Sequence, residues 1–193
     1  MALAKPTPYL TVAEYLEFEK DSPVKHEYID GQIYAMAGAS EAHNRIAGNL
    51  FNRLDDHLAD DECAPFISDM KVYVSATLYY YPDVVVACDP PGSDPYYRQK
   101  PILLVEVSSP GTERIDRNEK LAAYKGIRSL KEIVLVAQER VQIEVFRRQR
   151  GDHWQREVLA TMNEELRLQS VGLTLQVAQV YRRVKFEPPA PGQ

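Results

Sequence analysis

The 193-residue chain lacks the features that mark secreted, membrane-spanning and disulfide-rich proteins. Residues 1–6 contain no signal-peptide core, and no apolar run approaches the length that crosses a bilayer. We therefore expect a cytoplasmic protein with no part in the membrane. Cys63 and Cys88 share no motif spacing. Without a secretion signal they are expected to be free thiols in a reducing compartment.

A surplus of positive charge is also missing. The chain has 28 acidic and 23 basic residues, which gives a formal net charge of -5. Proteins that hold nucleic acid non-specifically through its phosphates usually carry a basic surplus. Nucleic-acid binding by this chain must therefore depend on a local basic patch or on a metal ion.

The length and an ordinary 45% hydrophobic content are typical of one globular domain with a real core. We expect a disordered N-terminus over residues 1–8, a single domain over 9–183 and a flexible, proline-rich tail over 184–193. The sequence contains no internal repeat and no linker long enough to separate two domains.

Local signals predict the N-terminal elements. Thr11 and Glu14 match a capping box, which predicts a helix as far as about residue 19. An Asp-Gly pair at residues 30–31 predicts the turn of a hairpin over 25–37. Ser40 is a suitable N-cap for a helix over about 41–60, since apolar residues recur there at helical spacing and His43 lies on the same stripe.

The rest of the chain alternates between strand-like and helix-like patterns. Residues 101–107 are apolar on both faces apart from Glu106, which is typical of a central strand covered on both sides. These patterns predict an α/β sandwich whose central mixed β-sheet is flanked by helices. The expected strands lie near 65–68, 70–76, 82–87, 101–107, 132–137, 141–148 and 154–159, and the expected helices near 113–126 and 174–182.

Three polar residues stand in or beside these apolar segments: Asp83, Glu106 and Lys120. A carboxylate buried in a central strand costs several kcal/mol unless it is paired or bound to a metal, so Glu106 requires a cation. Two carboxylates on neighbouring strands favour a hard divalent cation such as Mg²⁺. Such a cation activates water and polarises a phosphate, and a nearby amine stabilises the developing charge.

At these residues the chain resembles the PD-(D/E)xK nuclease superfamily, and within it the Uma-two-type restriction endonuclease family. The shared motifs are KHEYIDG at 25–31, His43, YPDV at 81–84, LVEVSSP at 104–110, and Asp116 with Lys120 and Tyr124. The resemblance covers roughly residues 11–180 and implies a restriction endonuclease-like fold.

The resemblance also implies a site. Asp83, Glu106 and the backbone carbonyl of Val107 would bind Mg²⁺, for which Mn²⁺ can substitute. The superfamily lysine usually stands two residues after the glutamate, where this chain has Ser108. We therefore expect Lys120 to supply the amine from the next helix.

Two further residues are candidate supporting groups. The family pattern suggests that Glu27 points toward the carboxylates, although it could equally be a surface strand residue. His43 could contact a phosphate or orient Glu27, but a histidine on a helix face more often has only a packing role.

Each of the three principal residues also has a structural explanation. Asp83 could form a turn with the proline before it. Glu106 could pair with an arginine across the sheet. Lys120 could be a solvated helix residue paired with Asp116, four positions earlier.

The remaining polar and aromatic groups are read mainly as structural. Asp69 is expected at a strand edge, with a supporting role at the site as the less favoured alternative. The arginines at 147, 148 and 150 could touch a backbone phosphate, but a solvated turn is favoured. The tyrosines at 79–81, 96 and 97 could stack on bases, but such residues more often serve packing.

The sequence favours a divalent-metal-dependent endonuclease that hydrolyses DNA by means of metal-activated water. The alternative is a weakly active or inactive nuclease-fold protein that binds nucleic acid or a protein partner in a regulatory role. Cutting both strands of a duplex usually needs two sites, so we expect a homodimer, with residues 141–159 as the candidate contact surface.

Overall fold

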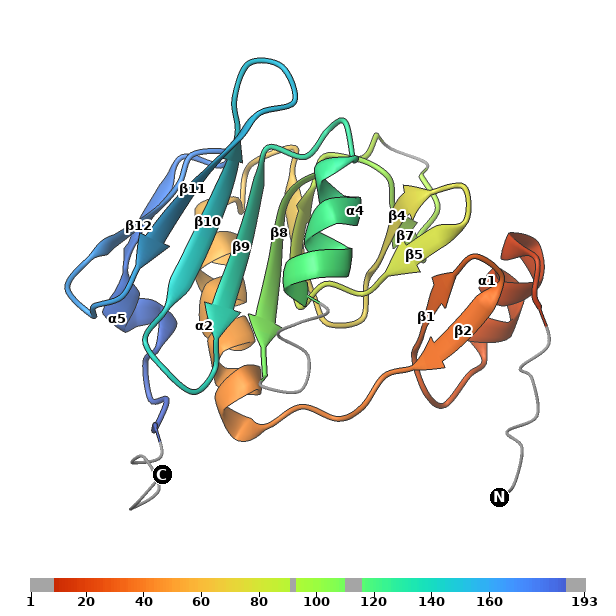
Figure 1. Cartoon of the computed structure of the whole chain (residues 1–193), viewed down its shortest axis with the longest axis horizontal. Helices are drawn as coiled ribbons and strands as arrows, with labels where there is room; N and C mark the ends of the chain where they lie inside the picture. The colour runs from red at the N-terminus through yellow and green to blue at the C-terminus, as the bar shows by residue number, and fades with distance from the viewer. Residues whose placement is uncertain (1–8, 91–92, 110–115, 187–193) are drawn as a thin grey trace.

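A six-stranded mixed sheet forms the centre of the molecule in the computed structural model, which describes residues 9–90, 93–109 and 116–186 (Figure 1). Its strand order is β11-β10-β9-β8-β6-β3, and β8 and β9 are its parallel pair. The strands are β3 (Ala64–Ile67), β6 (Val84–Ala87), β8 (Pro101–Ser108), β9 (Glu132–Ala137), β10 (Ile143–Arg148) and β11 (Trp154–Leu159).

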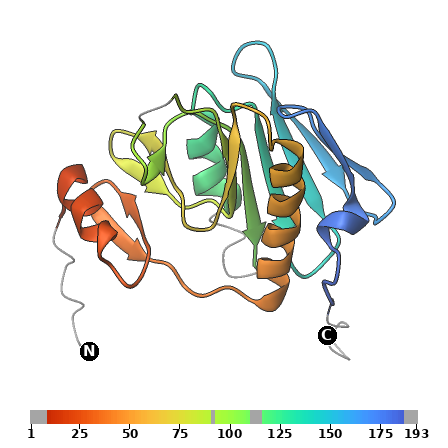
Figure 2. The ribbon, with the colours of Figure 1, turned by 180° about the vertical axis from the view of Figure 1, so that it is seen from behind.

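Helices cover both faces of this sheet, as Figures 1 and 2 show from opposite sides. On one face, α2 (Glu41–His57) buries the predicted apolar stripe, and the side chain of Val105 packs there. On the other face lie the π-helical turn η1 (Asp116–Lys120) and α4 (Leu121–Lys125), and α4 packs its apolar side chains in a cluster that includes Leu104. Alternate residues of β8 pack against helices on opposite faces of the sheet, which explains why the sequence of this strand is apolar on both sides.

A second sheet, in the order β2-β1-β5-β4-β7, carries the N-terminal segment. The predicted hairpin forms, with Asp30 and Gly31 both at positive φ in its turn. Helix α1 (Val12–Lys20) begins at the predicted capping box and stacks the ring of Tyr15 on that of Tyr28. The strands are β1 (His26–Ile29), β2 (Gln32–Ala35), β4 (Lys71–Ser75), β5 (Leu78–Tyr80) and β7 (Tyr97–Arg98).

The mixed α/β fold with helices on both faces of a central sheet is therefore as predicted, but the C-terminal part differs. A helix was expected near 174–182, but residues 173–176 form β13 (Leu173–Gln176), which pairs with β12 (Glu165–Leu168). Helix α5 (Val177–Val180) follows directly. The apolar side chains of this hairpin alternate and bury one face, so period two prevails over helical spacing up to residue 176.

The prediction of free thiols is wrong, because Cys63 and Cys88 form a disulfide. The cause is the antiparallel register of β3 and β6, in which Ala64 lies opposite Ala87. Continuing that register by one residue brings the two cysteines face to face. Their 25-residue separation in the chain gave no sign of this pairing.

The two ends of the chain bear on the predicted domain limits. Residues 1–8 and 187–193 lie outside the described residues, whereas Val184 and Phe186 pack against the main core. The limits at residues 9 and 183 stay a prediction. No helix in the described part of the chain has the length and apolarity to cross a bilayer.

Candidate functional site

The candidate site lies where β6 begins and β8 ends. Val84 pairs with Val105 across the two antiparallel strands. Continuing that register by one residue places Asp83 beside Glu106. Strand pairing thus brings together two acids that are 23 positions apart in the chain.

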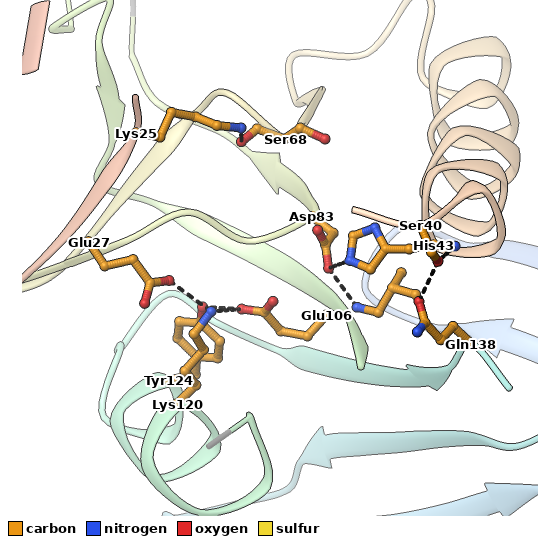
Figure 3. Close-up of polar contacts among 11 residues, drawn as sticks. Lys25, Glu27, Ser40, His43, Ser68, Asp83, Glu106, Lys120, Tyr124 and Gln138 are labelled. Carbon is orange, nitrogen blue, oxygen red and sulfur yellow. Dashed lines mark hydrogen bonds and ion pairs between the residues drawn. The ribbon is translucent and has the colours of Figure 1, made fainter. Parts of the chain in front are cut away.

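Glu106 is almost completely buried, with 4% of the residue exposed. Its Oε1 accepts a hydrogen bond from the Tyr124 hydroxyl at 2.5 Å, and the Nζ of Lys120 lies 3.4 Å from the same oxygen. Both partners come from the helical segment that covers this face of the sheet (Figure 3). The cation that a carboxylate in a central strand requires is therefore available from the protein itself.

Lys120 joins Glu106 to a second acid. Its Nζ lies 2.8 Å from Oε1 of Glu27, which reaches the site from β1 in the other sheet (Figure 3). The lysine side chain is 10% exposed, and those of Glu27 and Glu106 are 14% and 5% exposed. One ammonium group thus bridges two carboxylates in surroundings with little water, where each charge interaction is stronger than at the surface.

The placement of Lys120 agrees with the expectation that the amine arrives from the helix. Ser108, at the usual lysine position, is buried at the end of β8. Lys120 is the last residue of η1, and π-helical turns frequently occur at functional sites. The side chain of Asp116, its suggested structural partner, lies outside the described residues.

Asp83 has different partners from Glu106. Its Oδ2 accepts a hydrogen bond from the backbone N–H of Val107 at 2.7 Å and lies 3.2 Å from Nε2 of His43. The Asp83 carbonyl in turn accepts a hydrogen bond from the backbone N–H of Ser68. These contacts hold the Asp83 carboxylate at the end of β8.

His43 reaches Asp83 from the first turn of α2. That turn is fixed by Ser40, whose hydroxyl accepts a hydrogen bond from the His43 backbone N–H and donates one to Gln138. The histidine is therefore placed to orient Asp83, whereas Glu27, which it was suggested to orient, lies against Lys120 (Figure 3).

Tyr80 forms an uncharged wall of the site. Burial, reinforced by the nearby negative charge of Glu27, raises its pKa to about 12. Its ring meets that of Tyr124 edge-on, with the ring centroids 5.7 Å apart, and lies 5.4 Å from the Lys120 ammonium. The phenol stays protonated at neutral pH, so the ring attracts the ammonium group without adding a charge.

The donor chemistry of the site suits a hard divalent cation. Asp83 and Glu106 offer carboxylate oxygens, and the Val107 carbonyl is the third donor that the family resemblance implies. Among the described residues, no group of three or more His, Cys, Asp or Glu side chains is arranged to hold a metal. Mg²⁺ commonly binds through one or two carboxylates with water and substrate phosphate, so a two-carboxylate set fits it.

Two of the three arginines expected in a solvated turn differ from that interpretation. The side chain of Arg148 is only 18% exposed and donates hydrogen bonds to the carbonyls of Leu130, Lys125 and Ile127. Arg147 was expected in a solvated turn, but it is buried and bonds Glu132 at 2.9 Å. The reason is that its strand, β10, lies inside the sheet between β9 and β11. Asp69, which was expected at a strand edge, pairs with Lys25 at 2.7 Å.

A second polar cluster escaped the sequence analysis. Glu19 is buried at the end of α1. It accepts hydrogen bonds from the His26 backbone and from the Tyr81 hydroxyl. The sequence held one hint of this cluster. Its partners His26 and Tyr81 lie in the motifs KHEYIDG and YPDV, which also contain the site residues Glu27 and Asp83.

Several known proteins are similar to this chain over most of its length. Residues 12–178 match the model of the Uma2 family, which is described as "Putative restriction endonuclease". An uncharacterized protein of Synechocystis sp. is 36% identical over 94% of this chain and 96% of its own length. A second uncharacterized protein of that organism is 32% identical over 86% of this chain and 96% of its own length.

A solved structure shares the fold. It is a crystal structure from Anabaena variabilis described as "a putative nuclease belonging to DUF820". The TM-score is 0.69 at 17% sequence identity, and the match covers 89% of this chain and 97% of the other.

Proposed function

Because the chain belongs to the Uma2 family, described as "Putative restriction endonuclease", we propose that it is an Mg²⁺-dependent endonuclease that hydrolyses phosphodiester bonds in DNA. The observation that carries this proposal is the bridging position of Lys120, with its ammonium group 2.8 Å from Glu27 and 3.4 Å from Glu106. An acidic site with one buried amine matches the needs of phosphoryl chemistry, in which anionic oxygens must be held and stabilised.

Asp83, Glu106 and the Val107 carbonyl would hold the metal ion. When bound, Mg²⁺ polarises the phosphate and lowers the pKa of a coordinated water. Hydrolysis forms a bond between phosphorus and the water oxygen and breaks the bond to the leaving oxygen, which takes up a proton. His43 orients Asp83, and Tyr124 fixes the Glu106 carboxylate by its hydrogen bond.

Lys120 would stabilise the negative charge that develops on the phosphate oxygens. Its amine is held by two carboxylates from different sheets, so its position depends on both β1 and β8. Glu27 then acts as a positioning residue for the amine.

The proposal is tested by nicking of supercoiled plasmid in Mg²⁺ or Mn²⁺ by the wild type and by Glu106→Gln and Asp83→Asn. Removal of one charged donor is expected to lower the rate by at least about 100-fold. The matched control is Asp56→Asn, which changes an exposed carboxylate near the far end of α2 and should cleave like the wild type.

Equal cleavage by the wild type and both site variants would contradict the assignment of the site. If the wild type binds DNA without cutting it in either metal, the regulatory, non-cutting alternative is favoured instead.

A further inference from the structure

A second polar cavity, of about 400 Å³, lies between the end of α1 and the start of β4. Its walls carry three ammonium groups, from Lys20, Lys25 and Lys71, against the carboxylates of Glu19 and Asp69. The lining thus has one more positive than negative side chain, in a chain with a formal net charge of -5. The volume falls within the range of small-ligand pockets.

Lys71 is the most enclosed of the three lysines, with 4% of the residue exposed. Its Nζ lies 3.3 Å from the Tyr81 hydroxyl and 5.4 Å from the centre of the Tyr81 ring. Burial lowers the pKa of this lysine from its usual value. An anion that enters the cavity would therefore meet an ammonium group that is poorly solvated.

The acid in the cavity wall already has partners. Glu19 accepts hydrogen bonds from the Tyr81 hydroxyl at 2.9 Å and from the His26 backbone at 2.7 Å, and the His26 ring lies 3.1 Å away. Asp69 is mostly exposed, with 81% of its side chain accessible. Lys20 and Lys25 already have carboxylate partners, Glu17 at 2.6 Å and Asp69 at 2.7 Å. Neither Glu19 nor Asp69 forms an ion pair with Lys71 in the described part of the chain, so the Lys71 ammonium group is the one most available to an anion.

An aromatic face completes the cavity. Tyr96 is half exposed, and the ammonium groups of Lys20 and Lys71 lie 5.8 Å and 6.0 Å from its ring centre. A flat ring beside cationic groups is the combination that binds a stacked base with its phosphate.

The cavity is close to the candidate catalytic centre in both chain and space. Lys25 and Tyr81 stand two residues before Glu27 and Asp83, respectively. Ser68 connects the two regions. Its carbonyl accepts a hydrogen bond from Lys25 (Figure 3), and its N–H donates one to the Asp83 carbonyl. Two residues of extended chain span roughly 7 Å, so one nucleic-acid strand can reach both places.

We propose that this cavity binds an unpaired nucleotide of the substrate strand next to the phosphate that is cut. The lysines would contact its phosphate, and Tyr96 would stack on its base. A base held in a duplex is stacked and paired and does not enter such a pocket without being flipped out. The preferred substrate class is therefore nucleic acid with single-stranded or unpaired positions. The location beside the cut phosphate rests on the proposed nuclease function, whereas binding itself does not.

The test measures binding of a fluorescently labelled 15-nucleotide single strand and of the corresponding duplex by anisotropy in EDTA, where cleavage does not interfere. Lys25→Gln and Tyr96→Ala are each expected to weaken single-strand binding about tenfold and to leave duplex binding within about twofold. Lys25→Gln should also reduce the slope of log K against log salt by about 0.7. The matched control is Lys131→Gln, which changes an exposed lysine directly before β9, outside the cavity lining.

Unchanged single-strand binding in both variants overturns the proposal, and so does an equal loss for single strand and duplex, which indicates a general phosphate-binding surface. Plasmid cleavage separates the two proposals. If the wild type does not cut but the variants lose single-strand binding, the cavity is supported and the nuclease function fails. If the wild type cuts and the variants bind normally, the nuclease function stands and the cavity proposal fails.

Discussion

Replacement of Lys120 by methionine tests the bridging contact directly. Methionine keeps most of the length of the side chain and removes only the charge. The variant leaves Glu27 and Glu106, whose side chains are 14% and 5% exposed, without the cation that bridges them. We expect a marked loss of stability in metal-free buffer.

The size of this loss follows from the geometry. At N–O distances of 2.8 Å and 3.4 Å, the two attractions are about 6 and about 5 kcal/mol at an effective dielectric constant of about 20. The cost of burying the charges offsets much of this sum, and removal of one partner of a buried pair typically costs about 3–5 kcal/mol. For a chain of this size that corresponds to a fall of about 10 °C in Tm.

The assay is thermal unfolding in EDTA, followed by circular dichroism. A double-mutant cycle with Glu27→Gln isolates the interaction, because the second change removes one of the two unpaired charges. We expect the double variant to recover about 2 kcal/mol relative to Lys120→Met alone. Mg²⁺ should stabilise Lys120→Met more than the wild type, because the metal ion replaces the missing ammonium group as the positive charge beside the carboxylates.

The matched control is Lys131→Met, which removes an exposed lysine and should change Tm by less than about 1 °C. The reasoning is refuted if Lys120→Met unfolds at the wild-type temperature, or if Glu27→Gln destabilises the Lys120→Met protein further. Either result means that the amine does not balance these acids.

Three further predictions concern stability. Burial raises the pKa of Tyr181 from 10.0 to about 12, so the free energy of unfolding of the wild type should fall by about 2–3 kcal/mol as pH rises from 10 to 12. Urea titrations should show a smaller fall for Tyr181→Phe. Parallel plots of stability against pH for the two proteins would contradict this prediction. Loss of the disulfide in Cys63→Ser should cost about 3.5 kcal/mol relative to the oxidised wild type, for a 25-residue loop. The reduced wild type should unfold at the same urea concentration as the variant. Ser40→Ala removes the N-cap of α2 and should lower the free energy of unfolding by about 1 kcal/mol. Ser40→Asp should keep most of the stabilisation that the cap provides, and equal losses in the two variants would count against the cap.

The parts of the fold that were predictable are those in which local signals agree. Thr11 and Ser40 act as N-caps where expected, and the stripe on α2 faces the sheet. The β12–β13 hairpin was missed because its strands have four residues each, and so short an alternation resembles helical spacing. The disulfide was missed for another reason. It depends on the register between β3 and β6, which is not a local property of the sequence.

The candidate site shows the same division. The expectation that Glu106 needs a cation came from the cost of burial alone, and the structure places the amine of Lys120 beside it. The contact of Glu27 with Lys120 and that of His43 with Asp83 depend on how two sheets and a helix meet. Sequence spacing therefore did not reveal which residue each of them contacts. Arg147 was misjudged because a basic cluster looks the same whether its strand is exposed or central.

The ammonium group between Glu27 and Glu106 has a consequence for how the protein is made and stored. A site composed only of acids would repel itself until a metal ion arrived, and folding would then depend on the metal supply. Here the chain carries its own counter-charge, so the newly made protein can reach its final shape in a chelating buffer or a metal-poor cell. Under the proposed mechanism, the metal supply then sets how many molecules are active at a given moment, while the number that are folded stays the same.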